Sequence, residues 1–323
     1  MSDPHLSESE KPSHKTAWER DTLERLAFAT LAEQRANRRW RIFFRLAWLL
    51  LAVMLIWTGF HKGGVGGTNP SQAHTAVVAI KGEIADGADA SAEWVVTALR
   101  AAFEDEGSQA VVLQINSPGG SPVQAGIIND EIRRLKEKHK KPVYAVVEES
   151  CASAAYYIAV AADEIYVDKA SIVGSIGVLM DGFGFTGLMD KLGVERRLMT
   201  AGVNKGFLDP FSPQTKPQRA HAQTLLDQIH KQFIQVVRDG RGKRLKETPE
   251  LFSGLFWSGE QAVELGLADG LGNLDYVARE IVKAEDVIDY TRHENVAERL
   301  AKRFGAAIGE GAVRAMQTMP QVR

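Results

Sequence analysis

The sequence predicts an α/β domain over residues 76–289, built on a largely parallel sheet. Short apolar runs rich in β-branched residues alternate there with stretches in which apolar residues recur every three or four positions. The first pattern is typical of buried strands and the second of amphipathic helices. Strands that alternate with helices favour a parallel sheet with helices packed on it. The strand-like runs are VVAIKG (77–82), AVVLQIN (110–116), PVYAVVEE (142–149), EIYVD (164–168) and VERRLM (194–199).

Two long helices are expected, over residues 122–138 and 217–238, because each range carries one apolar stripe. A further helix is expected after Ser258, since Ser258 and Gln261 match a capping box and Gly266 suits the helix end. The stripes are formed by Ile128, Ile132 and Leu135 in the first helix and by Ala222, Leu225, Ile229, Phe233 and Val236 in the second.

The composition excludes several classes of protein. With 45% hydrophobic and 25% charged residues the chain has the balance of a globular protein, so a disordered or fibrous class is excluded. A net charge of -2 gives no overall attraction to nucleic acid. The single cysteine, Cys151, excludes an internal disulfide and a thiolate-rich metal cluster. The eight histidines form no HExxH-like pattern, so we expect no metal and no other cofactor.

The run IFFRLAWLLLAVMLIWTGF (42–60) is predicted to cross a lipid bilayer once, as a signal-anchor helix. At about 1.5 Å per residue, its 19 residues nearly span the roughly 30 Å hydrocarbon core. Its one charge, Arg45, lies near the N-terminal end, from which it can reach the headgroups. A buried core helix is the alternative, but such a helix would have a polar face and this run has none.

The charges around this run predict its orientation. The polar segment 1–41 ends in a cluster of arginines, whereas only Lys62 follows the run closely. Positive charge stays on the cytoplasmic side, so the N-terminus is expected in the cytoplasm and the domain outside it. We therefore predict a single-pass protein of the cell (inner) membrane with an extracytoplasmic, periplasmic domain. The Gly-rich stretch 61–75 is predicted to be a flexible tether, and residues 290–323 a basic C-terminal tail.

The segment INSPGGSP (115–122) joins a buried strand to a helix. Gly119 and Gly120 let the backbone turn sharply and present N–H groups that no side chain blocks. Such groups suit the oxyanion of acyl transfer, a phosphate, or the thioester carbonyl of an acyl-CoA. A tight turn that binds nothing is the alternative.

The segment EESCASAAYYIAVAAD (148–163) is expected to end a strand before Ser150 and to begin a helix of small residues near Ala152. A nucleophile at that entry would lie at the carboxyl end of a parallel strand, where open α/β sheets bind ligands. The helix N-terminus adds partial positive charge there. Ser150 is expected to cap the helix and Cys151 to be a small buried residue. Ser153 is either a packing residue or a nucleophile.

Two later segments are rich in glycine. SIVGSIGVLM (171–180) is either a core strand bent at its glycines or a strand to which an extended peptide can add. TAGVNKGFLDPFSP (200–213) carries Lys205 among glycines. Most lysines in loops are solvated, and a lysine acts as a general base only when it is neutral, which requires desolvation or a hydroxyl network.

In this order, the segments NSPGG, SxAYYxAxAAD, GSIGV and a Gly-flanked lysine before PFSP resemble the S49 peptidase family. The run FWSGEQAVELGLADGLGNL (256–274) resembles the closing segment of that family, and the resemblance covers residues 76–283. One copy of the domain after one N-terminal span is similar to the short form of signal peptide peptidase A. The resemblance implies a crotonase-like fold, which is also found in the Clp protease subunit.

The resemblance also implies a Ser/Lys dyad, in which Ser153 is the nucleophile and Lys205 the general base. Ser175, in GSIGV, matches the serine that orients the lysine. The backbone N–H groups implied to stabilise the oxyanion are those of Gly119, Gly120 and Ala154.

A membrane-bound serine endopeptidase is therefore predicted, which cleaves remnant signal peptides or other peptides near the membrane through an acyl-enzyme. Short-form members assemble into homo-oligomeric rings, which implies that Ser153 of one subunit meets Lys205 of the next. A helix near 183–192 is expected to carry the chain outward between the two residues. The alternatives are a crotonase-type acyl-CoA enzyme and a non-catalytic peptide-binding scaffold of the same fold.

Overall fold

The computed structural model describes residues 38–54 and 72–292. The chain divides into two compact units, residues 1–66 and 67–323, which are considered separately. Residues 1–37, most of the predicted tether and the predicted tail beyond residue 292 lie outside the described residues.

In the first unit, residues 38–54 are helical. The apolar side chains of this helix are exposed, and Trp40 stacks on Phe44 with ring centroids 5.8 Å apart. The last six residues of the predicted span 42–60 lie outside the described residues. Within residues 38–54 and 72–292, no helix has both the length and the apolar character needed to cross a membrane.

The second unit is built on a mixed sheet of eight strands, which confirms the predicted α/β class. Its longest path runs β6-β5-β3-β2-β1-β8, and β4 joins β3 to β7. Every pairing is parallel except that of β5 with β6. The strands are β1 (His74–Lys81), β2 (Ser108–Ser117), β3 (Val143–Ala152), β4 (Glu164–Val167), β5 (Ile172–Gly174), β6 (Phe256–Ser258), β7 (Gly270–Leu271) and β8 (Val287–Asp289).

Strand β3 has two successive partners along one edge. Its first half pairs with β4 and its last three residues pair with β5. The carbonyl of Glu148 falls between the two partners, and the Ser171 hydroxyl donates a hydrogen bond to it at 2.5 Å. A side chain thus replaces the missing strand pairing at this point.

The helices begin and end close to the predicted positions. The capping box of Ser258 and Gln261 is confirmed, Gly266 lies just beyond that helix with φ +74°, and Thr215 and Gln218 form a second capping box. The helices are α2 (Ala92–Glu104), α3 (Pro122–His139), α4 (Ala154–Ala159), α5 (Thr186–Leu192), α6 (Lys216–Arg241), α7 (Gly259–Glu264) and α8 (Leu274–Tyr276).

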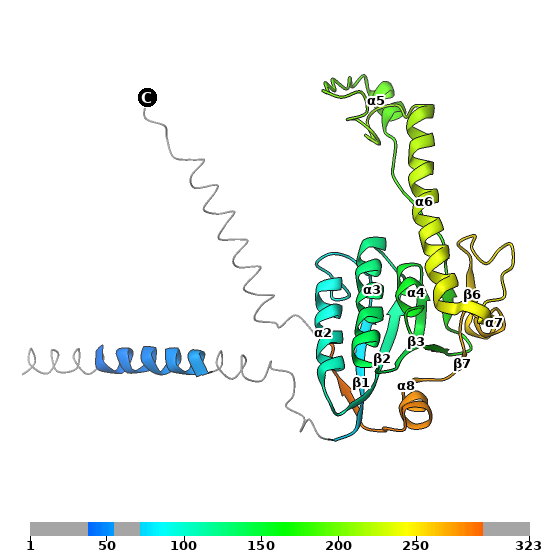
Figure 1. Cartoon of the computed structure of the whole chain (residues 1–323). Coiled ribbons are helices and arrows are strands. Elements are labelled where there is room, and N and C mark those ends of the chain that lie inside the picture. The colour runs from blue at the N-terminus through cyan, green and yellow to red at the C-terminus, as the bar shows by residue number, and fades with distance from the viewer. Residues whose placement is uncertain (1–37, 55–71, 293–323) are drawn as a thin grey trace, which may run out of the picture. The chain divides into compact units, whose positions relative to one another are not determined.

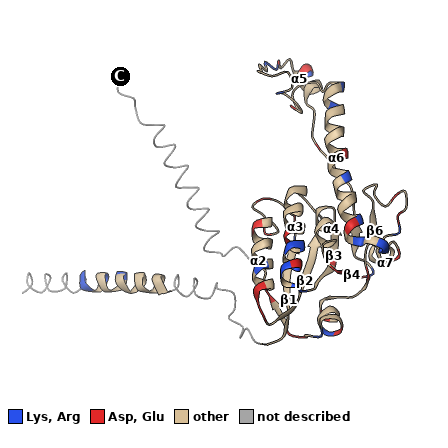
Figure 2. Ribbon diagram, viewed as in Figure 1, with Lys and Arg blue, Asp and Glu red and all other residues tan. Residues whose placement is uncertain are grey.

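Helices α2, α3 and α4 pack on one face of the sheet (Figure 1). Their apolar stripes form the core with the strands, and Leu99 and Ile132 are among its fully buried side chains. Charged residues are carried by α2 and α3, whereas α4 has none (Figure 2). A smaller apolar cluster that includes Val112, Val146 and Val277 lies outside this core.

Residues 178–215, which we call the arm, include α5 and adjoin the N-terminal end of α6 (Figure 1). The arm exposes many apolar side chains, and Met199 and Val203 are 94% and 98% exposed. Helix α6 buries side chains only toward its C-terminal end, where Phe233, Val237 and Arg241 meet the domain. The arm is therefore held away from the sheet by the exposed half of α6.

One prediction about this unit is wrong. The run VERRLM (194–199) is not a strand, because it lies in the arm with every residue exposed and no strand beside it to pair with among the described residues. Residues on either side of the range 76–289 also pack with the domain. Tyr290 is buried and hydrogen-bonded to His74 and Asp105, and β1 includes His74.

Glu131 of α3 is a buried carboxylate that stabilises the helical layer in a pH-dependent way. Hydrogen bonds from Arg134 lower its pKa to about 2, against the effect of burial and with help from Arg100. A carboxyl whose pKa is lowered on folding contributes stability above its unfolded-state pKa and loses it as pH falls toward the folded value.

We expect Glu131→Gln to lower the free energy of unfolding by about 1–3 kcal/mol at pH 7, because the charged hydrogen bonds are lost. The difference from wild type should shrink as pH falls from 4.5 toward 2, as measured by urea unfolding. Glu137→Gln, at an exposed position of the same helix, is the matched control and should have little effect. A deficit that stays constant over this pH range would contradict the assignment.

Candidate active site

The ends of β2 and β3 bring two of the predicted segments together. Ser117 of β2 pairs with Cys151 of β3 in parallel register, after an irregularity that follows Ile115. Because both strands end within a residue of this pair, the glycine turn after β2 and the start of α4 after β3 emerge side by side.

The glycine turn fits against Ser153 only because Gly119 has no side chain. Gly119 has φ +106°, and a Cβ there would lie 2.8 Å from the Ser153 Cβ and 3.0 Å from the Ala154 nitrogen. Gly120 has φ +148°, and a Cβ there would lie 2.2 Å from the Ile84 carbonyl oxygen. Both positions therefore require glycine for space as well as for conformation.

The same turn is hydrogen-bonded on one side only. Ile84 donates to the Gly119 carbonyl at 2.9 Å and accepts from Ser121 N–H at 2.7 Å, so the N–H of Gly120 points to the opposite side. Gly119 N–H donates to the Ser117 hydroxyl at 3.1 Å. Within residues 38–54 and 72–292, neither Gly120 N–H nor Ala154 N–H has an acceptor. Two donors thus remain beside Ser153.

Ser153 has a strained backbone at the junction of β3 and α4. Its φ of 53° and ψ of -122° are rare for a residue other than glycine. Its N–H donates to the Gly174 carbonyl at 2.8 Å, and its side chain does not cap α4. The residue is half-buried, so its hydroxyl is free to act on a group that approaches the end of the sheet.

Ser175 adjoins this junction through the next strand. Gly174 pairs with Ala152 in the sheet, and Ser175 follows it with φ 50°. The Ser175 N–H donates to the Leu255 carbonyl at 2.8 Å. Trp257 lies so close over Gly174 that a Cβ there would approach its ring to 2.9 Å. The contacts of Ile84 and Trp257 were not anticipated from the sequence, since each joins residues far apart along the chain.

Lys205 is not brought to this site within one chain. It lies in the arm between α5 and α6, its side chain is exposed, and its N–H donates to the Gly202 carbonyl at 3.1 Å. Figure 1 shows α5 and the start of α6 well away from α4 and the sheet. The structure therefore groups Gly119, Gly120, Ser153, Ala154 and Ser175 and leaves Lys205 apart.

The neighbours of Ser153 have structural roles. Cys151 is fully buried, and burial raises the pKa of its thiol, as expected for a small core residue. The prediction that Ser150 caps the helix is wrong, because β3 continues to Ala152 and the Ser150 hydroxyl lies 3.2 Å from Asn116 Oδ1 instead. The added-strand alternative does not hold for residues 172–174, since β6 already occupies that edge of β5.

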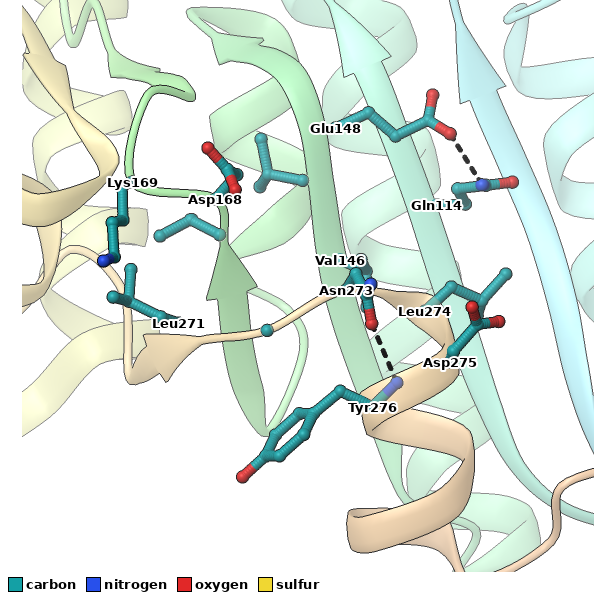
Figure 3. Close-up of a pocket in the computed structure, with 13 residues that line it drawn as sticks. Gln114, Val146, Glu148, Asp168, Lys169, Leu271, Asn273, Leu274, Asp275 and Tyr276 are labelled. Carbon is teal, nitrogen blue, oxygen red and sulfur yellow. Dashed lines mark hydrogen bonds between the residues drawn. The ribbon is translucent and has the colours of Figure 1, made fainter.

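A hollow of about 700 Å³ lies elsewhere, on the sheet surface between β3 and the segment before α8 (Figure 3). Glu148 in this hollow accepts a hydrogen bond from Gln114 at 2.7 Å and forms an ion pair with Lys81 at 3.2 Å. Asn273 on the other side caps α8. None of the predicted site residues lines this hollow. Within the described residues, no cluster of His, Cys, Asp or Glu could hold a metal.

The site lies at the end of a parallel sheet, with a strained serine, a glycine turn and unpaired backbone donors, as in enzymes that transfer acyl groups. The family model of Peptidase family S49 matches residues 135–288. A stretch of 225 residues is 32% identical to a putative protease of Methanocaldococcus jannaschii and covers 68% of this chain and 72% of that protein. The chain belongs to Peptidase family S49, as its resemblance predicted, and is similar to the SppA members of that family.

Other relatives match over shorter parts of their length. The putative signal peptide peptidase SppA of Enterococcus faecium is 32% identical over 199 residues, which are 61% of this chain and 57% of that protein. The Na(+)/H(+) antiporter NhaA of Brucella melitensis is 49% identical over 176 residues, or 54% of this chain. Those residues are only 24% of the antiporter, so the chain spans about a quarter of that relative.

We expect Gly120→Ala to destabilise the domain by about 2–5 kcal/mol, because the new Cβ would collide with the Ile84 carbonyl at a positive φ. Gly126→Ala is the matched control, since Gly126 lies inside α3 with nothing within 4 Å of the added carbon. It should stabilise the domain by about 0.5–1 kcal/mol. Thermal unfolding measures both changes, and equal effects would contradict the role of the turn.

Proposed function

We propose that this protein is a membrane-anchored serine endopeptidase with Ser153 as nucleophile and Lys205 as general base. The observation that carries the proposal is the placement of Ser153, which lies on a strained backbone against a glycine turn with two unpaired N–H donors beside it. Family membership supports the peptidase class, and the family motifs support the Ser/Lys dyad.

The chemistry proceeds in two steps. Neutral Lys205 accepts the hydroxyl proton of Ser153 as the serine oxygen bonds to the scissile carbonyl carbon. The tetrahedral oxyanion accepts hydrogen bonds from Gly120 and Ala154 N–H. When the carbon–nitrogen bond breaks, the lysine gives its proton to the leaving amine and an acyl-enzyme remains. Water, deprotonated by the same lysine, then attacks the ester carbonyl, and the lysine returns its proton to the Ser153 oxygen as the ester bond breaks and the peptide acid leaves.

The position of Lys205 supports a site shared between subunits. A lysine that acts as a base must be desolvated, but the arm of a single chain leaves Lys205 in solvent. The arm also exposes an apolar surface that water does not favour. Both features are explained if the arm of one subunit docks beside Ser153 of the next, in a ring with a head-to-tail interface.

The predicted span and its flanking charges support attachment to the membrane through residues 42–60, with the peptidase domain on the extracytoplasmic side. A peptidase held there would meet peptides released into or near the bilayer. We propose remnant signal peptides and other apolar, membrane-proximal peptides as its substrates.

A fluorophosphonate should label wild-type protein at Ser153, and Ser153→Ala should lose both labelling and peptide hydrolysis. Ser150→Ala is the matched control, because Ser150 lies in the same segment but bonds to Asn116, and it should remain active. Mass spectrometry locates the label. Labelling retained in Ser153→Ala would refute the nucleophile assignment.

A mixture of Ser153→Ala and Lys205→Ala chains, unfolded and refolded together, should recover about a quarter of wild-type activity. In a random equal mixture, about one boundary in four joins an intact serine to an intact lysine. Each variant refolded alone should be inactive, as should Lys205→Arg, since arginine stays protonated. No recovery in rings of normal size would place both residues in one chain.

A further inference from the structure

Among the described residues, His230 is the only side chain of α6 that forms a hydrogen bond with the segment beside the candidate site. Its Nε2 atom lies 3.0 Å from the carbonyl oxygen of Ile176, one residue after Ser175. A carbonyl oxygen only accepts, so Nε2 carries the proton and donates. The ring is half-buried and lies just before Phe233, the first fully buried position of α6.

The segment that receives this bond is held on its other sides as well. Ser175 N–H bonds to Leu255, and Gly177 N–H donates to the Ser175 carbonyl at 2.8 Å. The side chain of Ile176 is fully buried. A Cβ on Gly177 would lie 3.0 Å from the Gly254 Cα, so the backbones are in close contact. The carbonyl of Ile176 is held by His230 across the gap to α6.

This segment is linked to the nucleophile by one hydrogen bond. Ser153 N–H donates to Gly174, which directly precedes Ser175. Ser153 and Ser175 both have positive φ, at 53° and 50°, which costs free energy unless surrounding contacts maintain it. The hydrogen bond from His230 reaches the residue that directly follows Ser175.

We propose that His230 is a positioning residue, which fixes the Ser175 turn and through it the geometry of Ser153. The proposal rests on the proposed peptidase function and names a residue that the family motifs do not include. His230 also lies on the helix that adjoins the arm, because the N-terminal end of α6 directly follows the arm that carries Lys205 (Figure 1). The hydrogen bond of His230 therefore connects α6, which holds the arm, to the segment that contains Ser175.

The test compares two replacements of different chemistry. His230→Phe keeps an aromatic ring but cannot donate, and it should lower kcat for peptide hydrolysis by about tenfold with little change in KM. His230→Gln keeps a donor and should retain most of the wild-type kcat. Gln232→Ala, at an exposed position two residues along α6, is the control and should match wild type.

Hydrogen exchange gives a readout that does not depend on activity. Amides of residues 171–180 should exchange about tenfold faster in His230→Phe than in wild type, while the His230→Gln and Gln232→Ala proteins stay protected. Unchanged exchange in His230→Phe, or equal loss of protection in the Phe and Gln variants, would overturn the proposal. The two proposals can fail separately. If the wild-type protein hydrolyses no peptide but exchange is still faster in His230→Phe, the structural role of His230 is supported and the peptidase function is refuted.

Discussion

The site depends on one close contact, in which the turn after β2 lies against the first residue after β3 with no room for a Cβ between them. The contact requires the parallel register that pairs Ser117 with Cys151, and it requires glycine at residue 119. It is supported on the outside by the bridge to Ile84 and on the inside by the bond from Ser153 to Gly174. The sheet and its neighbours hold a strained serine beside free backbone donors.

Much of this could be predicted from the sequence. The strands that form β1 to β3 are continuous apolar runs, and α3 and α6 carry clear apolar stripes, so local pattern and tertiary packing agree there. The glycine turn could be located because two glycines directly follow a buried strand, although the pattern alone left open a tight turn that binds nothing. The prediction of a strand at 194–199 is wrong, because this short run with apolar ends has no neighbouring strand among the described residues to pair with.

Other features depend on contacts between distant parts of the chain. Ser150 has the right residue type for a helix cap, but pairing of Ala152 with Gly174 extends β3 past it. The bridge from Ile84 to Gly120 and the packing of Trp257 over Gly174 join residues far apart in sequence. The placement of Lys205 in the arm follows from the length of α6, which carries its own N-terminal end beyond the domain. Periodicity predicts that such a helix exists but not where its free end lies.

Because β3 has two successive partners, the neighbour of this strand changes halfway along one edge of the sheet. Below Glu148 the edge is formed by β4 and β7, and above it by β5 and β6, so the strand that leads to Ser153 belongs to both halves. At the break itself, the Ser171 hydroxyl donates to the Glu148 carbonyl, which lies between the residues paired with β4 and those paired with β5. Because β2 pairs with β3 both before and after Glu148, the end of β3 that leads to Ser153 is fixed to the sheet from its other side. Residues 150–152 therefore have a different neighbour from residues 144–146 without any break in the strand that leads to Ser153.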